Sequence, residues 1–387
     1  MIDEMRACMF HRMPCILLPL VAIVFVLPHS AAVAELPSQA TVLEWGDESM
    51  AAVEAAFRVE QDYWYLEDVS TWRSTPRGKP VFMWGAGVQL SALAAATSNQ
   101  PEKYRGQLDG YVKALHHYWH EHLRIGGYDV SPHAGSADRY YDDNAWIVLG
   151  LVEGYEVTQD ASYLKQAKAT FNFVISGEDD RLGGGIYWRE KELLSKNTCT
   201  NAPAMVGAIR LYELTEETAY LETAKRLYAW TCEHLQDEDG LFWDNINMRG
   251  EVDRRKYSYN SALMIRANCG LYRITGEEKY KQEAERIAKA AKAKWYNEET
   301  GAMNDAGRFA HLLVDAFLEV YATTGEQQWL DTCRKTVGYV HEELRDERGF
   351  YPGNWGDSQR RRSGKAAMID QASVSRVFQA VARAMAN

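Results

Sequence analysis

Two adjacent carboxylates, Asp142 and Asp143, are the residues of this sequence best placed to do chemistry. They follow two tyrosines, and they open a strongly apolar segment, 145–157, that reads as a helix facing a core. Neighbouring side chains on a helix diverge by about 100°, yet their Cβ atoms stay close. Both carboxyls could therefore flank one bond of a bound substrate and perform acid/base work on it.

A structural explanation competes with this catalytic one. Asp is common at helix starts, where its oxygen caps free N–H groups and its charge suits the helix dipole. Asp138 already offers such a cap four residues before Asp142. If Asp138 takes that role, Asp142 and Asp143 lie inside the helix without a structural task, and function becomes the better explanation.

An internal repeat indicates which elements position this pair. Each copy leads with a tyrosine and reads as a tight turn, in which Thr, Gly or Asp ends one helix and Glu-rich residues open the next. The leading residues are Tyr155, Tyr212, Tyr272 and Tyr321. Longer connections rich in Gly and aromatic residues alternate with these turns, at 125–139, 177–197, 236–256, 296–307 and 345–365.

The alternation of short turns and long loops predicts an all-α fold, an (α/α)6 barrel of six helical hairpins over residues 35–387. No Val/Ile-rich alternation of strand type recurs along the chain. An open helical solenoid shares the pattern, but six hairpins use up these residues, which favours a closed ring. We expect inner helices to begin near Phe82, Tyr140, Thr198, Tyr257, Phe309 and Ile369, and outer ones near Asp47, Glu102, Ser162, Ala219, Glu278 and Glu326.

The long loops share a chemistry suited to sugars. Twelve tryptophans and 22 tyrosines exceed what a helical core needs, and many lie in these loops beside amides and carboxylates. Aromatic faces next to hydrogen-bonding groups fit the apolar faces and hydroxyl edges of sugar rings. For any single ring, core packing remains the competing explanation. The loop candidates for substrate binding are Trp188, Trp243, Asp244, Asp305 and Trp355, and Tyr141 flanks the carboxylate pair.

The first residues read as a targeting segment. Residues 1–34 have the pattern of a signal peptide, with two arginines before an apolar run at 16–27 and a small-residue cleavage site at Ala32 and Ala34. The run is broken by Pro19 and is shorter than the ~20 residues that span a bilayer, so we expect no stable membrane span. The predicted location is secreted or periplasmic after cleavage.

Charge and cysteine content exclude several classes of partner. The net charge of −11 argues against nucleic acid or an anionic membrane as a partner. Four cysteines follow residue 34, none in a CxxC spacing, and each lies in a helical pattern where an unpaired thiol packs as a small apolar residue. His116 and His120 stand one helical turn apart, but not in the HExxH order. We therefore expect no metal, no cofactor and a monomeric chain.

At these motifs the chain resembles glycoside hydrolase family 76, the endo-α-1,6-mannanases. The resemblance runs from about Trp45 to Asn354 and is carried by YYDDNAW at 140–146, KNT at 196–198 with NAPA at 201–204, DGL at 239–241 with Asp244, and YSYNSA at 257–262. It implies an (α/α)6 barrel and a retaining mechanism, with Asp142 as nucleophile and Asp143 as acid/base. It also adds Asn201, Tyr259 and Asn260 to the substrate-binding candidates. The family often has Gly where this chain has Ser261.

The chemistry of the pair agrees with that assignment. Glycosidases commonly use two carboxyls, about 5–5.5 Å apart when configuration is retained and about 6.5–9.5 Å apart when it is inverted. Adjacent residues favour the shorter spacing. We expect Asp142, nearer the helix start, to stay ionised, while the neighbouring charge raises the pKa of Asp143. The resemblance thus implies a hydrolase that cuts α-1,6-mannan internally, and the signal-peptide pattern predicts that it is secreted.

Two other classes of protein remain open. Another (α/α)6 enzyme acting on carbohydrate is possible: a cell-wall transglycosidase shares the retaining intermediate, whereas a sugar epimerase or an uronyl hydrolase wants His or Arg in the loops. A non-catalytic glycan-binding protein would keep the aromatic loops but would not need Asp142 and Asp143 together.

Overall fold

The computed structural model of this chain describes residues 35–60, 64–70, 78–121, 125–132, 139–356 and 364–386. The expected signal peptide at 1–34 and the expected helix cap Asp138 lie outside these ranges. Residues 36–387 cluster as one unit, so the helical repeat forms a single domain.

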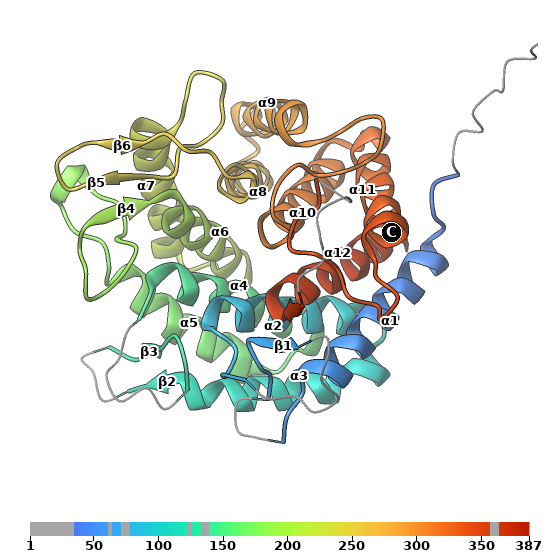
Figure 1. The fold of residues 1–387 in the computed structure, drawn as a ribbon. Coiled ribbons are helices and arrows are strands. Elements are labelled where there is room, and N and C mark those ends of the chain that lie inside the picture. The colour runs from blue at the N-terminus through green and yellow to red at the C-terminus, as the bar shows by residue number, and fades with distance from the viewer. Residues whose placement is uncertain are drawn as a thin grey trace, which may run out of the picture. The chain divides into compact units, whose positions relative to one another are not determined.

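In the described part of the chain, twelve α-helices alternate between an inner and an outer layer (Figure 1). The inner helices are α2 (Met83–Asn99), α4 (Tyr141–Thr158), α6 (Thr198–Thr215), α8 (Ser258–Thr275), α10 (Gly307–Thr324) and α12 (Met368–Ala386). The outer helices are α1 (Gln39–Phe57), α3 (Pro101–Leu115), α5 (Ala161–Ile175), α7 (Thr218–Leu235), α9 (Glu278–Trp295) and α11 (Gln327–Tyr339). Each inner helix packs on the next and α12 packs on α2, so the ring closes and the expected (α/α)6 barrel is confirmed.

The expected starts of the inner helices are confirmed closely, whereas the first outer helix was placed wrongly. It begins at Gln39 and not near Asp47, because Ser38 caps it by accepting a hydrogen bond from the N–H of Thr41 at 3.2 Å. Asp47 lies inside the helix and pairs with Lys103 of α3 at 2.7 Å.

The tyrosine-led repeat has a common backbone geometry. At the end of α4, α6, α8 and α10, one residue takes the left-handed conformation and donates its N–H to the carbonyl of the leading tyrosine. Gly276 and Gly325 adopt this conformation without strain, whereas Gln159 and Glu216 do so as non-glycine residues. The pairs are Gln159 with Tyr155, Glu216 with Tyr212, Gly276 with Tyr272 and Gly325 with Tyr321.

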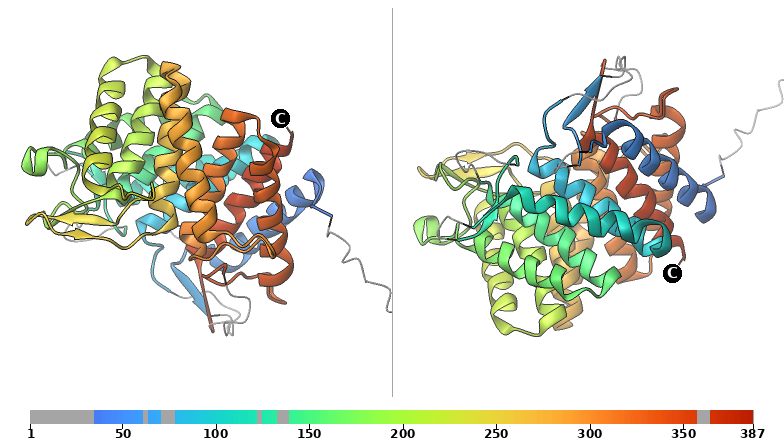
Figure 2. Two further views of the ribbon diagram at one scale, coloured as in Figure 1. Left: turned by 90° about the horizontal axis from the view of Figure 1, so that it is seen from above. Right: turned by 90° about the horizontal axis from the view of Figure 1, so that it is seen from below.

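Short antiparallel strands occupy the long loops, where the sequence pattern predicted none. The strands β4 (Ser195–Asn197), β5 (Asn245–Asn247) and β6 (Val252–Asp253) form one sheet in that order. Strand β1 (Asp68–Ser70) pairs with β7 (Lys365–Ala367), and β2 (Trp119–His120) pairs with β3 (Gly127–Tyr128). Segments of two or three residues are too short to show an alternating pattern. Figure 2 shows the yellow β5–β6 hairpin extending beyond the helices.

Buried side chains in the first turn of inner helices fasten these loops to the barrel. Asn144 accepts a hydrogen bond from the Tyr128 N–H at 2.8 Å and donates one to the Tyr128 carbonyl at 3.0 Å. Gln371 makes the same pair of bonds to Tyr351, both at 2.9 Å. The Tyr128 loop is therefore held to the turn of α4 that carries Asp142 and Asp143, and the Tyr351 loop is held to the first turn of α12.

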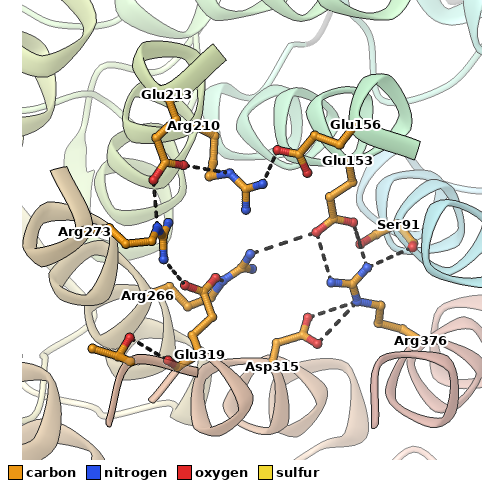
Figure 3. Close-up of polar contacts among 11 residues, drawn as sticks. Ser91, Glu153, Glu156, Arg210, Glu213, Arg266, Arg273, Asp315, Glu319 and Arg376 are labelled. Atoms are coloured by element: carbon orange, nitrogen blue, oxygen red, sulfur yellow. Dashed lines mark hydrogen bonds and ion pairs between the residues drawn. The ribbon is translucent and has the colours of Figure 1, made fainter. Parts of the chain in front are cut away.

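Further along the inner helices, a network of ion pairs joins all six of them (Figure 3). Arg376 of α12 binds Glu153 of α4 at 2.7 Å and Asp315 of α10 at 3.1 Å. Ser91 of α2 donates to the same Glu153 at 2.7 Å. The circuit continues through Glu319 of α10, Arg266 and Arg273 of α8, and Glu213 and Arg210 of α6, and returns to α4 at Glu156.

This network borders an open pocket of about 300 Å³, which is lined by four arginines and four carboxylates among small apolar side chains. Burial raises the pKa of Glu153, but the charges of Arg376 and Arg266 outweigh burial and hold that pKa below its ordinary value. A buried charge of this kind is tolerated because it is paired, so losing one partner leaves an uncompensated charge in the interior.

Replacing Arg376 with Met should therefore destabilise the fold by about 3–5 kcal/mol, because Glu153 and Asp315 lose their shared cation. The matched control is Lys168→Met, which breaks an ion pair with Glu217 at the protein surface and should cost less than about 1 kcal/mol. Urea unfolding of both variants measures the difference. Equal losses would show that the network does not support the ring.

Candidate functional site

The carboxylate pair lies in the first turn of α4 and does not serve as its cap residue. The cap position belongs to Tyr140, whose side chain makes no capping bond. Asp142 is partly exposed and Asp143 is buried. Helix α4 therefore presents two carboxyls at the end of the barrel where the long loops meet.

The carboxylate of Asp142 is held from two other elements. The indole Nε1 of Trp188, in the loop after α5, donates to Asp142 Oδ2 at 2.9 Å. The thiol of Cys199, in the first turn of α6, donates to the same oxygen with Sγ at 3.5 Å. These contacts hold the Asp142 side chain between α4, α6 and the loop that runs from α5 to β4.

Burial dominates the electrostatics of this carboxyl. It raises the pKa of Asp142 to about 7, although hydrogen bonds from Trp188, the backbone N–H of Asp143 and Cys199 each lower that pKa. The expectation that Asp142 stays ionised does not agree with this raised pKa, because burial outweighs the hydrogen bonds that the carboxylate accepts. Asp143, the next residue along α4, is buried as well.

A third carboxylate, Asp244, lies in the same cluster. Burial raises its pKa, while a hydrogen bond from the Asn245 side chain at 3.0 Å lowers it. After burial, the charges of Asp142 and Asp244 contribute most to the raised pKa of Cys199, and a hydrogen bond with Tyr259 lowers it. Side chains from α4, α6, α8 and the loop after α7 thus meet around the Asp142 carboxylate.

Two groups of aromatic rings stand at the starts of the inner helices. Tyr259 stacks on Phe309 with ring centres 4.5 Å apart, and Phe309 stacks on Trp84 at 5.6 Å, which joins α8, α10 and α2. Tyr140 contacts the Trp188 ring at 5.1 Å, and both Trp188 and Phe82 are among the most exposed large apolar side chains described. These flat surfaces beside the acidic cluster can hold sugar rings.

Sequence reasoning missed Phe82, Trp84, Tyr140, Phe309 and Cys199 as site residues. The substrate-binding residues were expected in the loops, whereas these side chains lie in the first turn of an inner helix or at the residue before it. The available signal was that several expected inner-helix starts are aromatic. It was used only to place the helices.

Three of the predicted substrate-binding residues are buried and make packing or backbone contacts. The Tyr141 ring is 4% exposed and stacks on Phe173 of α5 at 4.9 Å. Asn201 is fully buried, and its amide binds the backbone of Ile186 and Asn197. Trp355 is 0% exposed.

The remaining predicted residues divide into two kinds. Asp305 is partly exposed, but its carboxylate accepts hydrogen bonds from the N–H groups of Ser258 at 2.9 Å and Ala306 at 2.8 Å, so it supports the start of α8. Trp243 is partly exposed, and the guanidinium of Arg254 lies 5.1 Å from its ring centre. The structure therefore brings Trp188, Asp244, Tyr259 and Asn260 together with the pair, and leaves Trp243 available on the same loop as Asp244.

No group of His, Cys, Asp and Glu side chains suited to a metal ion occurs among the described residues. Cys199, Cys232, Cys269 and Cys333 are free thiols. His120 contacts buried Asp129 with Nε2 3.5 Å from a carboxylate oxygen, so the histidine cluster has a local partner. Within the described ranges, no helix is long and apolar enough to cross a membrane.

Comparison with known proteins shows which family this chain is similar to. The model of Glycosyl hydrolase family 76 matches residues 47–317. An α-mannanase of that family from Bacteroides thetaiotaomicron is 32% identical, with a TM-score of 0.84 over 88% of this chain and 95% of the other. An inactive α-1,6-mannanase variant from Salegentibacter, solved with α-1,6-mannotriose, is 22% identical, with a TM-score of 0.76 over 89% of this chain and 99% of the other, and shows the shared fold.

A curated relative, the mannan endo-1,6-alpha-mannosidase DCW1 of Candida glabrata, is 25% identical over 187 residues. The match covers 44% of this chain and 42% of that protein. The chain thus spans less than half the length of this relative.

The different burial of Trp188 and Trp355 predicts that truncating them costs different amounts of stability. Trp355→Ala should cost about 3–5 kcal/mol in the free energy of unfolding, because it empties a fully buried site. Trp188→Ala should cost less than about 1.5 kcal/mol, because the ring is already 40% exposed. Urea unfolding of both variants tests this. A larger loss for Trp188→Ala would place that ring in the core.

Proposed function

The chain belongs to glycoside hydrolase family 76, and we propose that it is a secreted enzyme that hydrolyses α-1,6-mannosidic linkages inside mannan with retention of configuration. The observation that carries this proposal is the position of Asp142 and Asp143 at the loop end of the barrel, beside exposed aromatic rings. A glycan-binding protein would use the rings but has no need of two neighbouring, desolvated carboxyls.

The names of similar proteins support the choice of substrate. The Bacteroides thetaiotaomicron neighbour is described as an α-mannanase, and the Candida glabrata relative as a mannan endo-1,6-alpha-mannosidase. The Salegentibacter enzyme was inactivated by replacing two adjacent aspartates with asparagine before it was combined with α-1,6-mannotriose. This chain has one such pair at the start of α4, which favours the same chemistry here.

The proposed reaction has two steps. In the first, Asp143 donates a proton to the glycosidic oxygen while an oxygen of Asp142 attacks the anomeric carbon, which releases one sugar chain and leaves the other bound as an ester. In the second, Asp143 takes a proton from water, and the water oxygen displaces Asp142 from the same carbon. Two inversions restore the original configuration. The rings of Trp188 and Tyr259 offer apolar faces to the sugars, and Asp244 and Asn260 offer hydrogen bonds to hydroxyls.

The raised pKa of Asp142 sets an expected pH dependence. Because the nucleophile must be ionised, kcat/KM should fall as pH decreases through about 7, where Asp142 takes up a proton. Initial rates on linear α-1,6-mannan from pH 4 to 9 measure this limb. A rate that stays constant down to pH 5 would contradict the assignment of Asp142 as an ionised nucleophile with that pKa.

Substitution of each carboxylate should separate the two roles. Asp142→Ala and Asp143→Ala should fold yet lose about 10³-fold or more in kcat, and azide should rescue only Asp143→Ala, since a small anion can replace the water that Asp143 activates. Proton NMR of the first wild-type product should show the α-anomer. Asp305→Asn is the control, because this carboxylate supports the start of α8 and should leave kcat within about threefold.

Other outcomes point to the alternatives. An initial β-product would mean inversion with a more distant base such as Asp244. Products longer than the substrate would indicate a transglycosidase, because a sugar can intercept the ester in place of water. Binding of mannan without cleavage would favour a glycan-binding protein. Activity on uronides alone would exclude mannan as the substrate.

Export is the remaining part of the proposal, and it rests on the sequence of residues 1–34. Cleavage after Ala34 should yield a mature chain that starts at Glu35, because the charged start, apolar run and Ala-x-Ala site match a signal peptide. Intact-mass spectrometry of the protein recovered from the medium or periplasm measures the start. Recovery of a chain that still begins at Met1 would refute cleavage.

A further inference from the structure

Cys199 occupies an unusual place for a free thiol. It lies in the first turn of α6, is 5% exposed, and directs Sγ at Oδ2 of Asp142 from 3.5 Å. The same Oδ2 accepts the Trp188 indole N–H at 2.9 Å. One oxygen of the proposed nucleophile therefore receives two side-chain donors, each from a different element of the barrel.

The surroundings keep this thiol protonated. Burial raises the pKa of Cys199 well above its ordinary value, and the charges of Asp142 and Asp244 raise it further. Tyr259 of α8 interacts with the thiol, and burial likewise raises the pKa of its hydroxyl. Asp143, next to Asp142 on α4, is a further titratable group near the contact. At neutral pH, Cys199 is therefore an S–H donor and not a thiolate.

We propose that Cys199 is a positioning residue for the reaction, and that its thiol holds Oδ2 of Asp142 and stabilises the negative charge of the attacking carboxylate. This inference rests on the proposed function of the Asp142–Asp143 pair. The thiol acts through Asp142 and takes no part in bond making. Because S–H is a weak donor, it orients the carboxylate without removing as much nucleophilicity as a strong donor would.

A purely structural role is the competing explanation, since free cysteines pack well as small apolar residues. The chain contains a matched example of that role. Cys333 of α11 is fully buried, and its Sγ lies 3.6 Å from the carbonyl oxygen of Val314, a backbone partner within the α10–α11 hairpin. Removing either thiol empties a similar volume, but only Cys199 contacts a catalytic carboxylate.

Three variants separate the two explanations: Cys199→Ala, Cys199→Ser and Cys333→Ala. Cys199→Ala should lower kcat about threefold to tenfold and move the acid limb of kcat/KM to higher pH, because the ionised form of Asp142 loses a donor. Cys199→Ser, which retains a donor, should recover most of the rate and return the limb towards the wild-type position. Cys333→Ala should leave the limb unmoved. The inference is overturned if the acid limb of kcat/KM stays at the wild-type pH in Cys199→Ala, or if it shifts equally in Cys333→Ala.

A second readout does not depend on substrate. The Trp188 indole donates to Asp142, so ionisation of Asp142 should change the fluorescence of that indole. Subtracting the pH titration of Asp142→Asn from that of the wild type isolates this change, and the midpoint should rise in Cys199→Ala. If the wild type does not cut mannan but the fluorescence midpoint is still higher in Cys199→Ala than in the wild type, the proposed function is wrong and the contact between Cys199 and Asp142 is supported. If the fluorescence midpoint is the same in Cys199→Ala and the wild type, the thiol does not stabilise the charge of Asp142, and this result holds for any substrate.

Discussion

The buried ion-pair circuit of the inner helices is the constraint on which the rest of this structure depends. Glu153, Arg376 and Asp315 are surrounded by protein, where an unpaired charge is far more costly than in water. Each inner helix must therefore present its polar side chain at one level of the ring (Figure 3). That requirement fixes the position of each inner helix along the ring axis relative to its neighbours.

The site is a consequence of that alignment. Asp142 and Glu153 belong to the same helix, so the circuit that holds Glu153 also sets the position of the carboxylate at the helix start. First turns from α4, α6 and α8 then bring Asp142, Cys199 and Tyr259 into one cluster. Loops complete the cluster, and buried amides such as Asn144 tie them to the same turns.

Placing carboxyls at this junction changes their chemistry. In water, two neighbouring aspartates would both be ionised at neutral pH. Here burial raises the pKa of Asp142 to about 7, and the donors Trp188 and Cys199 prevent it from rising further. As a result, the Asp142 carboxyl can either carry a charge or hold a proton near neutral pH.

The sequence by itself determined the features that depend on local spacing. The tyrosine-led turns repeat because the same cap geometry recurs at each helix end, and six hairpins with alternating loops already implied the barrel. The Asp142–Asp143 pair was recognisable because adjacent carboxylates at a helix start are chemically conspicuous. The first outer helix was misplaced because the cap Ser38 went unrecognised.

Only the tertiary structure decided which side chains reach the site. Tyr141 and Trp355 are residue types that often bind sugars, yet Tyr141 packs on Phe173 and Trp355 is fully buried. Cys199, in contrast, reads as an apolar residue in a helix, and it contacts Asp142 because α6 packs beside α4. Burial and contact depend on the neighbours that cover a side chain, and these come from distant parts of the chain. Spacing along the sequence cannot supply that information.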